Sequence, residues 1–260
     1  MATASRALGE LTSPDVGKLL KDTSILCLPM GAIEQHGPHL PLNTDVVIAE
    51  GLTRRFVARW GETHDLLQLP AVPIGLSREH DWAAGTLSLS IQTFTALLRD
   101  LAREFVRALP ARNLAFVNGH GGNRGLLECL QHELAGDFGL NCCVIHPFDL
   151  AAHNADPTQA DVHGGKDETS VMLALAPEAV RRDLIVSAQP DPKAVQSLIF
   201  DRGASWPWRT DDPRLARDGV IGDAGTATAE FGEAIIARMV EAAGGVFATL
   251  RERQALMRKP

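Results

Sequence analysis

Residues 24–31 read SILCLPMG and residues 114–122 read LAFVNGHGG. Each stretch opens with a short apolar run that stops at a glycine, which is typical of a buried strand leading into a loop. A third run, Asn141 to His146 (NCCVIH), has the same character. Helical patterns lie between and after these runs: Asp45 to Trp60, Ile91 to Leu109, Asn123 to Phe138, Thr169 to Ala176 and about Thr226 to Arg253. This alternation predicts a three-layer α/β/α fold with a mostly parallel central sheet.

The chain is predicted to form one domain, residues 1–260, because it contains no internal repeat, low-complexity tract or linker. Two long segments, Pro147 to Val162 and Ser187 to Asp223, are expected to be loops of the kind that cover a site. The last helix is expected to kink at Gly244-Gly245.

The chain has 25 Lys and Arg against 32 Asp and Glu, a net charge of −7. This balance disfavours nucleic acid and anionic membranes as partners and favours a small-molecule substrate. No apolar run approaches the ~18 residues of a spanning helix, and the first twenty residues lack a secretory apolar segment, so a cytoplasmic protein is expected. The cysteines follow no CxxC spacing and are expected to be buried, reduced thiols: Cys27, Cys129, Cys142 and Cys143.

Acidic and imidazole side chains follow the predicted strands. Glu34, His36 and Asp45 come directly after the first strand. In an extended segment the α-carbons of Glu34 and His36 would be roughly 6.5 Å apart on one side of the chain, which suits two neighbouring metal ions. Asp45, at the start of the next helix, would bridge these ions. His120 follows a different strand, in a loop whose glycines allow close approach. Because the carboxyl ends of parallel strands share one edge, these groups are expected to meet.

A third segment, HGGKDETS, supplies His163 and Glu168 at the head of a short predicted helix. Taken alone, its acidic residues are explained by charge compensation at a helix N-terminus. His120, taken alone, is explained by a structural role in its glycine-rich turn. Three segments with the same ligand chemistry together predict a metal site. Mixed imidazole and carboxylate ligation favours Zn, Mn or Fe(II), and the lack of thiolate ligands favours a catalytic site over a structural one.

Metal-activated water would serve as the nucleophile. The sequence has no GxSxG elbow, no HExxH and no GxxxxGK[ST] phosphate loop. Three alternatives to an amide hydrolase stay open on these residues. They are a two-metal phosphoesterase, a non-catalytic metal- or ligand-binding protein, and a scaffold in which the polar clusters only cap helices.

Several longer motifs contain these residues: GAIEQHGPHLPLNTD (31–45), GLSREH (75–80) with AGTLSLS (84–90), FVNGHGGN (116–123), HGGKDETSVMLAL (163–175) and GVIGDAGTATAEFGE (219–233). Through them the chain resembles the creatininase family of metal-dependent amidohydrolases. The resemblance implies an α/β/α fold, a two-metal centre, hydrolysis of a carbon–nitrogen bond of a cyclic or linear amide, and homo-oligomers, usually hexamers. It implies that Glu34 and His120 hold one metal. His36 would hold the other and Asp45 would bridge both, while His163 would carry protons to the leaving nitrogen.

The sequence departs from true creatininases at Gly122, where they have a carboxylate that binds the second metal. In the branch with the NGHGGN motif, Glu168 is expected to take that role. The chain also lacks the tryptophan before His163 that closes over creatinine, so creatinine is not the expected substrate. The same branch includes the mycofactocin maturation peptidase and formamide-hydrolysing enzymes, which are the alternative functions.

The remaining site predictions concern groups around the two divalent ions. Three residues are expected to contact the amide substrate: Ser77, His80 and Gly121. A purely structural role is equally open for Glu79 and His80, and His39 is expected to support the ligands from behind. Trp206 and Trp208 flank a proline in the second long loop, where a pocket lid and a subunit contact are both open.

Overall fold

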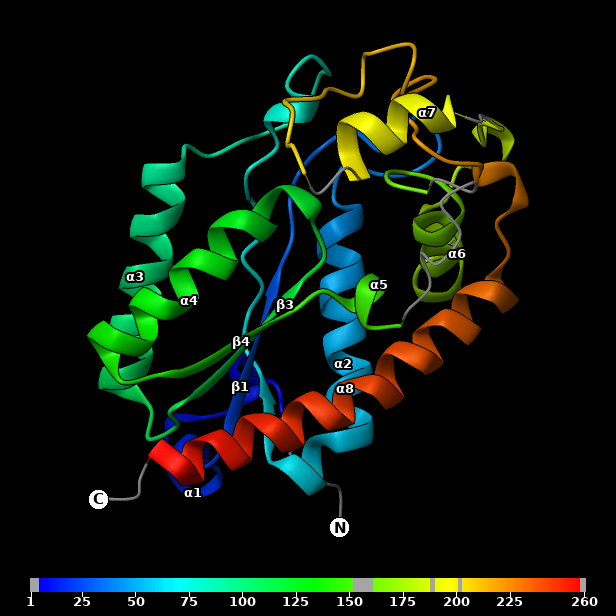
Figure 1. Cartoon of the computed structure of the whole chain (residues 1–260). Helices are drawn as coiled ribbons and strands as arrows, with labels where there is room; N and C mark the ends of the chain where they lie inside the picture. Colours follow the sequence, from blue (N-terminus) through cyan, green and yellow to red (C-terminus); the bar gives the residue numbers. More distant parts are fainter. Residues whose placement is uncertain (1–4, 152–160, 188–189, 201–202, 258–260) are drawn as a thin grey trace.

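The central sheet of the computed structural model has four parallel strands in the order β2-β1-β3-β4 (Figure 1). The structure describes residues 5–151, 161–187, 190–200 and 203–257. The strands are β1 (Ile25–Met30), β2 (Leu66–Gln68), β3 (Asn113–Asn118) and β4 (Asn141–Ile145). In register, Ile25 of β1 pairs with Leu66 and Asn113, and Asn113 pairs with Asn141.

Both faces of the sheet are covered by helices, as the uninterrupted apolar strands predict. Ile25 and Cys27 of β1 belong to one apolar core, while Leu26, Leu28 and Met30 belong to the other. The first core is closed by α2 (Thr44–His64), α6 (Lys166–Leu175) and α8 (Ala229–Met257). The second is closed by α1 (Ser13–Leu19), α3 (Ile91–Ala108) and α4 (Arg124–Phe138). Figure 1 shows these two groups of helices on opposite sides of the strands. The predicted three-layer fold is confirmed.

The order of the strands places a crevice at one end of the sheet. The chain passes from β1 through α2 to β2, and then returns past β1 to form β3 on its other side. Neighbouring strands whose connections leave in opposite directions open a crevice beyond their carboxyl ends, where ligands bind in doubly wound sheets. The loops that start at Gly31 after β1 and at Gly119 after β3 both enter this crevice.

Shorter elements fill the connections between the layers. Two short α-helices and one π-helical turn lie in the predicted long loops: α5 (Pro147–Leu150), α7 (Pro192–Val195) and η6 (Gln196–Phe200). The 3-10 turns are η1 (Leu8–Glu10), η2 (Arg78–His80), η3 (Gly121–Asn123), η4 (Pro177–Ala179), η5 (Arg182–Leu184) and η7 (Ala224–Thr226). Among the described residues, no helix is long and apolar enough to cross a membrane.

Two sequence expectations change in the structure. Helix α8 is unbroken through Gly244 and Gly245. Gly244 instead makes room for a packing partner, because an added β-carbon there would lie 2.6 Å from Cζ2 of Trp60. The four cysteines are free, but Cys129 is exposed on α4 and Cys142 and Cys143 are only partly buried, so the expectation that all four are buried is wrong. Only Cys27 is fully enclosed by the core.

Candidate metal centre

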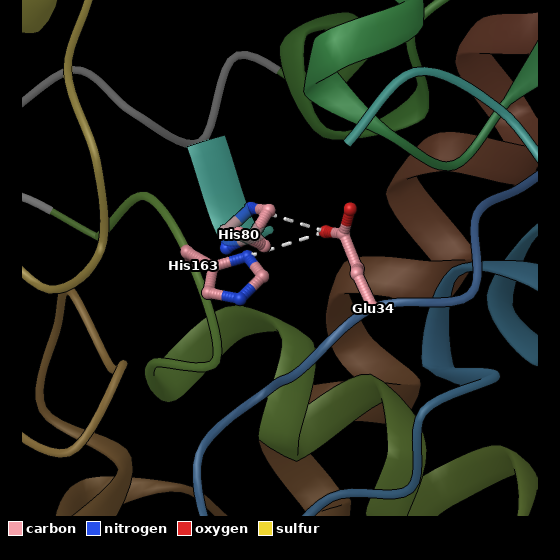
Figure 2. A group of neighbouring side chains, drawn as sticks. All are labelled: Glu34, His80 and His163. Atoms are coloured by element: carbon pink, nitrogen blue, oxygen red, sulfur yellow. Dashed lines mark ion pairs between the residues drawn. The ribbon is translucent and has the colours of Figure 1, made fainter. Parts of the chain in front are cut away.

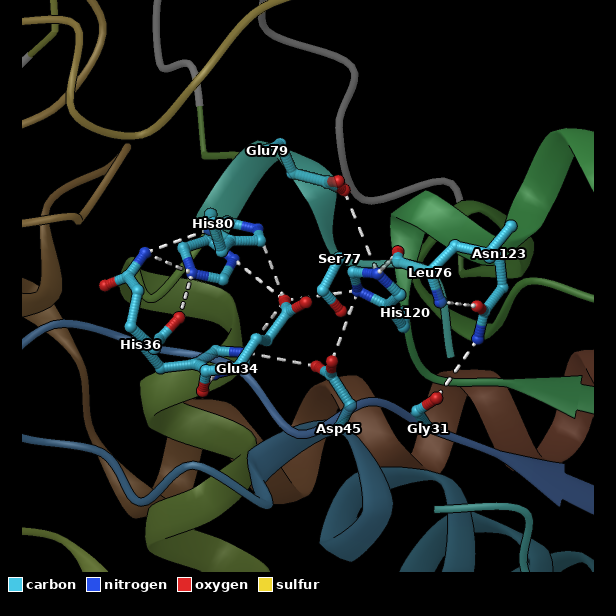
Figure 3. Close-up of polar contacts among 12 residues, drawn as sticks. Gly31, Glu34, His36, Asp45, Leu76, Ser77, Glu79, His80, His120 and Asn123 are labelled. Atoms are coloured by element: carbon cyan, nitrogen blue, oxygen red, sulfur yellow. Dashed lines mark hydrogen bonds and ion pairs between the residues drawn. The ribbon is translucent and has the colours of Figure 1, made fainter. Parts of the chain in front are cut away.

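The five predicted ligands come from four segments and meet beyond the strand ends. Figure 3 shows four of them together, Glu34, His36, Asp45 and His120. Glu34 and His36 follow β1, Asp45 lies in the first turn of α2, His120 follows β3, and Glu168 lies in the first turn of α6. The first four are at most 4 % exposed. A buried group of acids and imidazoles therefore forms where the sheet topology opens its crevice.

Asp45 lies between two histidines and presents a different oxygen to each. Its Oδ1 is 3.0 Å from Nε2 of His36, and its Oδ2 is 3.2 Å from Nδ1 of His120. Glu34 joins the second pair, with Oε1 also 3.2 Å from Nδ1 of His120. Glu168 joins the first pair, with Oε2 3.9 Å from Nε2 of His36. Two neighbouring groups of potential cation ligands result, and Asp45 is adjacent to both.

The donor atoms are arranged better for binding a cation than for forming hydrogen bonds with one another. Both carboxylate oxygens of Glu34 and Oδ2 of Asp45 are buried, and none of the described residues forms a hydrogen bond to them. Buried carboxylate oxygens are costly unless they are paired or coordinate a metal. Glu34, Asp45 and His120 offer ligand atoms within 4.8 Å of one another, and so do His36, His163 and Glu168. The mixed nitrogen and oxygen donor set suits Zn, Mn or Fe(II).

Backbone carbonyls fix the orientation of the two histidines. Nδ1 of His36 lies 3.1 Å from the carbonyl oxygen of Glu34, and Nε2 of His120 lies 2.6 Å from that of Leu76. A carbonyl only accepts, so these nitrogens carry the protons of the neutral rings. In the neutral rings the opposite nitrogens hold the lone pairs that could bind a metal, and they lie beside the carboxylates. Metal-binding histidines are oriented by hydrogen bonds of this kind.

The pKa values of the cluster show how strongly these groups interact. Burial lowers the pKa of His36, but the carboxylates of Asp45, Glu168 and Glu34 outweigh burial and raise it to about 10. Burial raises the pKa of Asp45, but His36 and His120 bring it well below its usual range. Burial is the main reason why the pKa of Glu168 rises to about 7. Without a metal, the cluster balances its negative charge by holding protons.

Figure 2 shows the rings of His163 and His80 next to each other, both facing the carboxylate of Glu34. Nε2 of His163 is 2.6 Å from the carbonyl oxygen of Gln35, while its Nδ1 is 3.7 Å from Oε1 of Glu34. The ring lies between those of His36 and His80, with centroids 4.3 and 4.1 Å away. Burial, followed by the charge of His36, places the pKa of His163 well below its usual range. His163 is therefore a neutral imidazole with a free Nδ1 directed at the cluster.

The three predicted substrate contacts lie in different surroundings. Ser77 is fully buried and its Oγ has no hydrogen-bond partner; Figure 3 shows it beside His120. His80 is also buried, with Nε2 only 3.3 Å from Oε1 of Glu34. Gly121 is exposed, and no heavy atom lies within 4 Å of where its β-carbon would be. Of the three, His80 has the closest contact with a predicted metal ligand.

Gly122 has no room for a side chain. A β-carbon there would clash with the carbonyl oxygen of Leu76 and would lie 2.5 Å from Nε2 of His120. It would also lie 2.6 Å from Oε1 of Glu79, which occupies the adjacent space. No carboxylate can therefore reach the cluster from position 122, which is consistent with Glu168 as the replacement.

Groups further out support the cluster. His39 bonds through Nε2 to Oγ1 of Thr169 at 2.8 Å and so contacts the turn of α6 that carries Glu168. Trp208 packs edge-on against His80, with ring centroids 6.4 Å apart, whereas Trp206 is 56 % exposed. Of the two tryptophans, Trp208 therefore lies over the site. Three of the remaining histidines lie outside the cluster: His64, His132 and His146. His153 is not among the described residues.

Two buried polar residues at the site were missed by the sequence analysis. Gln35 lies between two ligands in sequence, and this position was the available signal. Thr210 is 1 % exposed and comes from the second long loop, where no motif marks it. Both contact His80, with distances of 3.0 Å from Nε2 of Gln35 and 2.8 Å from Oγ1 of Thr210 to Nδ1 of the ring.

A doubly wound parallel sheet with a buried cluster of histidines and carboxylates at its crevice is typical of metal-dependent hydrolases. Comparison with known proteins agrees with this class. Residues 9–246 match the family model described as creatininase, creatinine amidohydrolase. The chain belongs to the creatininase family, hydrolases that act on carbon–nitrogen bonds, and the predicted family is confirmed.

Relatives with known names cover almost the whole chain. The mycofactocin precursor peptide peptidase of Mycobacterium tuberculosis is 36% identical over 244 residues, 90% of this chain and 88% of that protein. The creatinine amidohydrolase of Pseudomonas putida is 30% identical over 266 residues, 94% and 96% of the two chains. The solved structure "Creatininase Mn" superposes with a TM-score of 0.74 at 30% identity, covering 96% of this chain and 99% of that one.

Proposed function

We propose that this chain is a two-metal amidohydrolase that cleaves the carbon–nitrogen bond of a small cyclic or linear amide with metal-activated water. The observation that carries the proposal is a set of three buried carboxylate oxygens, both of Glu34 and Oδ2 of Asp45, without a hydrogen-bond partner among the described residues. Oε1 of Glu34 and Oδ2 of Asp45 each lie 3.2 Å from Nδ1 of His120. A phosphoesterase can use a similar donor set. Membership in a family of carbon–nitrogen hydrolases favours the amide.

The ligands divide between two divalent ions. Glu34 and His120 would hold one ion, His36 and Glu168 the other, and Asp45 would contact both through its separate oxygens. When bound, such a pair lowers the pKa of a water molecule to near 7 and polarises a carbonyl group. Zinc and manganese are proposed first, because the superposing creatininases include a Mn form and a Zn-Zn form, and iron is a third candidate.

His163 supplies the proton transfer. Its Nε2–H is held by the carbonyl of Gln35, so its Nδ1 is free to accept a proton at the cluster. The same atom can then return the proton to the departing nitrogen, which is the usual work of a general acid–base histidine. The hydroxyl of Ser77, buried and unpartnered, is proposed to donate to the substrate, and the open space at Gly121 to admit it.

Two substitutions separate these roles. Asp45→Ala should abolish turnover and reduce the bound metal, because it removes the ligand shared by both ions. His163→Ala should keep the metal and lose most of the rate, about 10²–10⁴-fold. His132→Ala, an exposed histidine on α4, is the control and should change neither. Metal content and hydrolysis of lactams, hydantoins, formamides and short peptides would be measured on Zn- and Mn-loaded protein. Full turnover by Asp45→Ala would end this mechanism.

A peptide or a formamide is the second candidate substrate. The mycofactocin precursor peptide peptidases are 32–36% identical over 90% of this chain. A pyrimidine-nucleotide deformylase of Methanothermobacter thermautotrophicus is 28% identical over 67% of it. Cleavage of short peptides without turnover of cyclic amides would favour the peptidase, and cleavage of p-nitrophenyl phosphate alone would favour a phosphoesterase. Metal binding without any turnover would favour a binding protein.

We also propose a cytoplasmic homo-oligomer, a hexamer by family resemblance. Its support is the match of the family model to residues 9–246, together with four unpaired cysteines in the structure. Light scattering after size-exclusion chromatography measures the mass of the assembly. A monomer at micromolar concentration would overturn this part of the proposal.

A further inference from the structure

The side chain of Gln35 is fixed in one orientation by two backbone groups. Its Oε1 accepts a hydrogen bond from the N–H of Gly37 at 2.9 Å, and its Nε2 donates to the carbonyl of Gly219 at 3.0 Å. A backbone N–H can only donate and a carbonyl can only accept. The amide therefore cannot be reversed, and its NH₂ group is the end that faces the two histidines.

This orientation determines which nitrogen of His80 carries the proton. Nε2 of Gln35 lies 3.0 Å from Nδ1 of His80. An NH₂ group has only hydrogens to offer, so a protonated Nδ1 would place two donors against each other. Nδ1 of His80 is therefore the acceptor, and its proton is on Nε2, which lies 3.3 Å from Oε1 of Glu34.

Thr210 supplies the hydrogen that Nδ1 of His80 accepts. Its Oγ1 is within reach of two donors, Nε1 of Trp82 at 3.0 Å and Nε2 of Gln35 at 3.1 Å. The two hydrogens of the Gln35 amide then go to the Gly219 carbonyl and to Oγ1 of Thr210, and Trp82 donates to the same oxygen, which leaves the Thr210 hydroxyl hydrogen to be donated. The shortest contact of Oγ1 is with Nδ1 of His80, at 2.8 Å, against 3.3 Å to the carbonyl of Glu79. The Thr210 hydroxyl therefore donates to His80.

His163 has the opposite arrangement. Its Nε2 is 2.6 Å from the backbone carbonyl of Gln35 and 3.1 Å from the Nε2 of that side chain. The shorter contact requires a proton on Nε2 of His163, which leaves Nδ1 bare. The 3.1 Å contact is then not a hydrogen bond, because the Gln35 hydrogens are donated to Gly219 and Thr210. Two imidazoles with centroids 4.1 Å apart thus present different groups to Glu34, an N–H from His80 and a lone pair from His163.

We propose that Gln35 and Thr210 are positioning residues that set opposite tautomers on His80 and His163. His80 then faces Glu34 with Nε2–H, 3.3 Å from Oε1, and His163 keeps its unprotonated Nδ1 toward the cluster. This inference rests on the proposed function for its use in catalysis, but the tautomers themselves are independent of any substrate.

The second long loop is consequently part of the site. Thr210 is tied to the segment of η2 by the bond from its N–H to the carbonyl of Glu79 at 3.1 Å. The neighbouring Arg209 forms an ion pair with Asp81 at 2.8 Å, and Trp208 packs on His80. This loop, whose described residues include no predicted ligand, therefore contributes a hydroxyl that acts on the predicted ligand Glu34 through His80.

The tautomers can be measured directly in the zinc-loaded, full-length protein. Labelling the nine histidines with ¹⁵N and recording long-range ¹H–¹⁵N correlations shows which ring nitrogen is protonated, and His80→Asn assigns the His80 signals. The expected result is Nε2–H on both His80 and His163. A proton on Nδ1 of His80 in the wild-type protein, or a metal-bound Nε2, would overturn the proposal without any variant.

Three variants test the positioning roles. Thr210→Ser keeps the hydroxyl and should keep the tautomer of His80 and the zinc affinity. Thr210→Val is similar in size but donates nothing, and Gln35→Glu replaces the NH₂ group by an acceptor. Both should shift the proton of His80 toward Nδ1 and weaken zinc binding about 10–100-fold, as for other partners of metal ligands. Wild-type spectra and zinc affinity in Thr210→Val and Gln35→Glu would refute these roles even if the enzyme proves to be a hydrolase.

Discussion

Gly122→Ala is expected to damage the metal centre although it adds a single methyl group. The new β-carbon would clash with the carbonyl oxygen of Leu76 and lie 2.5 Å from Nε2 of His120. Leu76 offers a backbone atom here, so no change of rotamer relieves the clash. The same carbonyl accepts the 2.6 Å hydrogen bond from His120 that directs Nδ1 at the carboxylates. Alanine must therefore displace this bond.

The size of the effect follows from two costs. Overpacking a filled site typically destabilises a protein by about 1–3 kcal/mol, so the free energy of unfolding of the metal-free variant should fall by that amount. Loss of the hydrogen bond that orients a metal-binding histidine typically weakens metal affinity by about 10–100-fold. This corresponds to about 1.4–2.8 kcal/mol of binding free energy.

The assay compares two adjacent glycines. Gly121→Ala is the matched control, because no heavy atom lies within 4 Å of its added β-carbon. Zinc dissociation constants would be measured by competition with a chromophoric chelator, and stability by chemical denaturation of the metal-free proteins. Gly122→Ala should be impaired in both measurements and Gly121→Ala in neither. Equal zinc affinity in the two variants and the wild type would refute the claim that position 122 is closed to side chains.

Three further predictions concern other parts of the chain. Gly245→Ala should raise the free energy of unfolding by up to about 1 kcal/mol through helix propensity, whereas Gly244→Ala should lower it by its clash with the facing tryptophan; equal shifts in urea denaturation would contradict this pair. Cys129 is exposed and should react fast with a thiol reagent at pH 8. Burial raises the pKa of Cys143 to about 12, so this thiol should react slowly. Mass spectrometry of the labelled peptides compares the two reaction rates, and equal rates would contradict the prediction. Burial lowers the pKa of His36, but neighbouring carboxylates raise it to about 10, so it is protonated in the metal-free protein at pH 7.5. It should release about one proton when zinc binds, so zinc affinity should rise with pH up to that value; calorimetry in buffers of different ionisation enthalpy measures the proton, and none released would contradict the prediction.

The layered fold could be predicted from the sequence because its strands are buried on both faces. The apolar run that contains Ile25 and Leu26 has no polar alternation, which only a sheet with helices on both sides explains. The ligand positions followed from the same reasoning, since Glu34 and His120 each come directly after a strand. Strand β2 gave no comparable signal. Its three residues are too few for a period, and it forms only by pairing with β1.

The parts of the site that could not be predicted depend on long-range contacts. Thr210 reaches His80 across 130 residues of sequence, from a loop whose composition is typical of any surface segment. The proton positions on His80 and His163 depend on the same contacts, because the Gly219 carbonyl that fixes Gln35 also comes from that part of the chain. A sequence pattern shows which residue types are available as ligands. The tautomer of a histidine depends instead on the neighbours that the fold brings to its ring.

The position of Glu168 changes what metal binding does to the protein. A carboxylate at residue 122 would belong to the same loop as His120, and the second ion would then tie together fewer elements. Glu168 comes instead from α6, where its Oε2 accepts the N–H of Gly164 at 2.6 Å and Thr169 next to it bonds to His39. An ion held by His36, Asp45 and Glu168 would therefore join the loop after β1 to α2 and α6. Because these two helices pack in the same core as α8, binding free energy at the site would also stabilise that layer. If Glu168 supplies the ligand that position 122 lacks, the metal centre would be coupled more closely to the core.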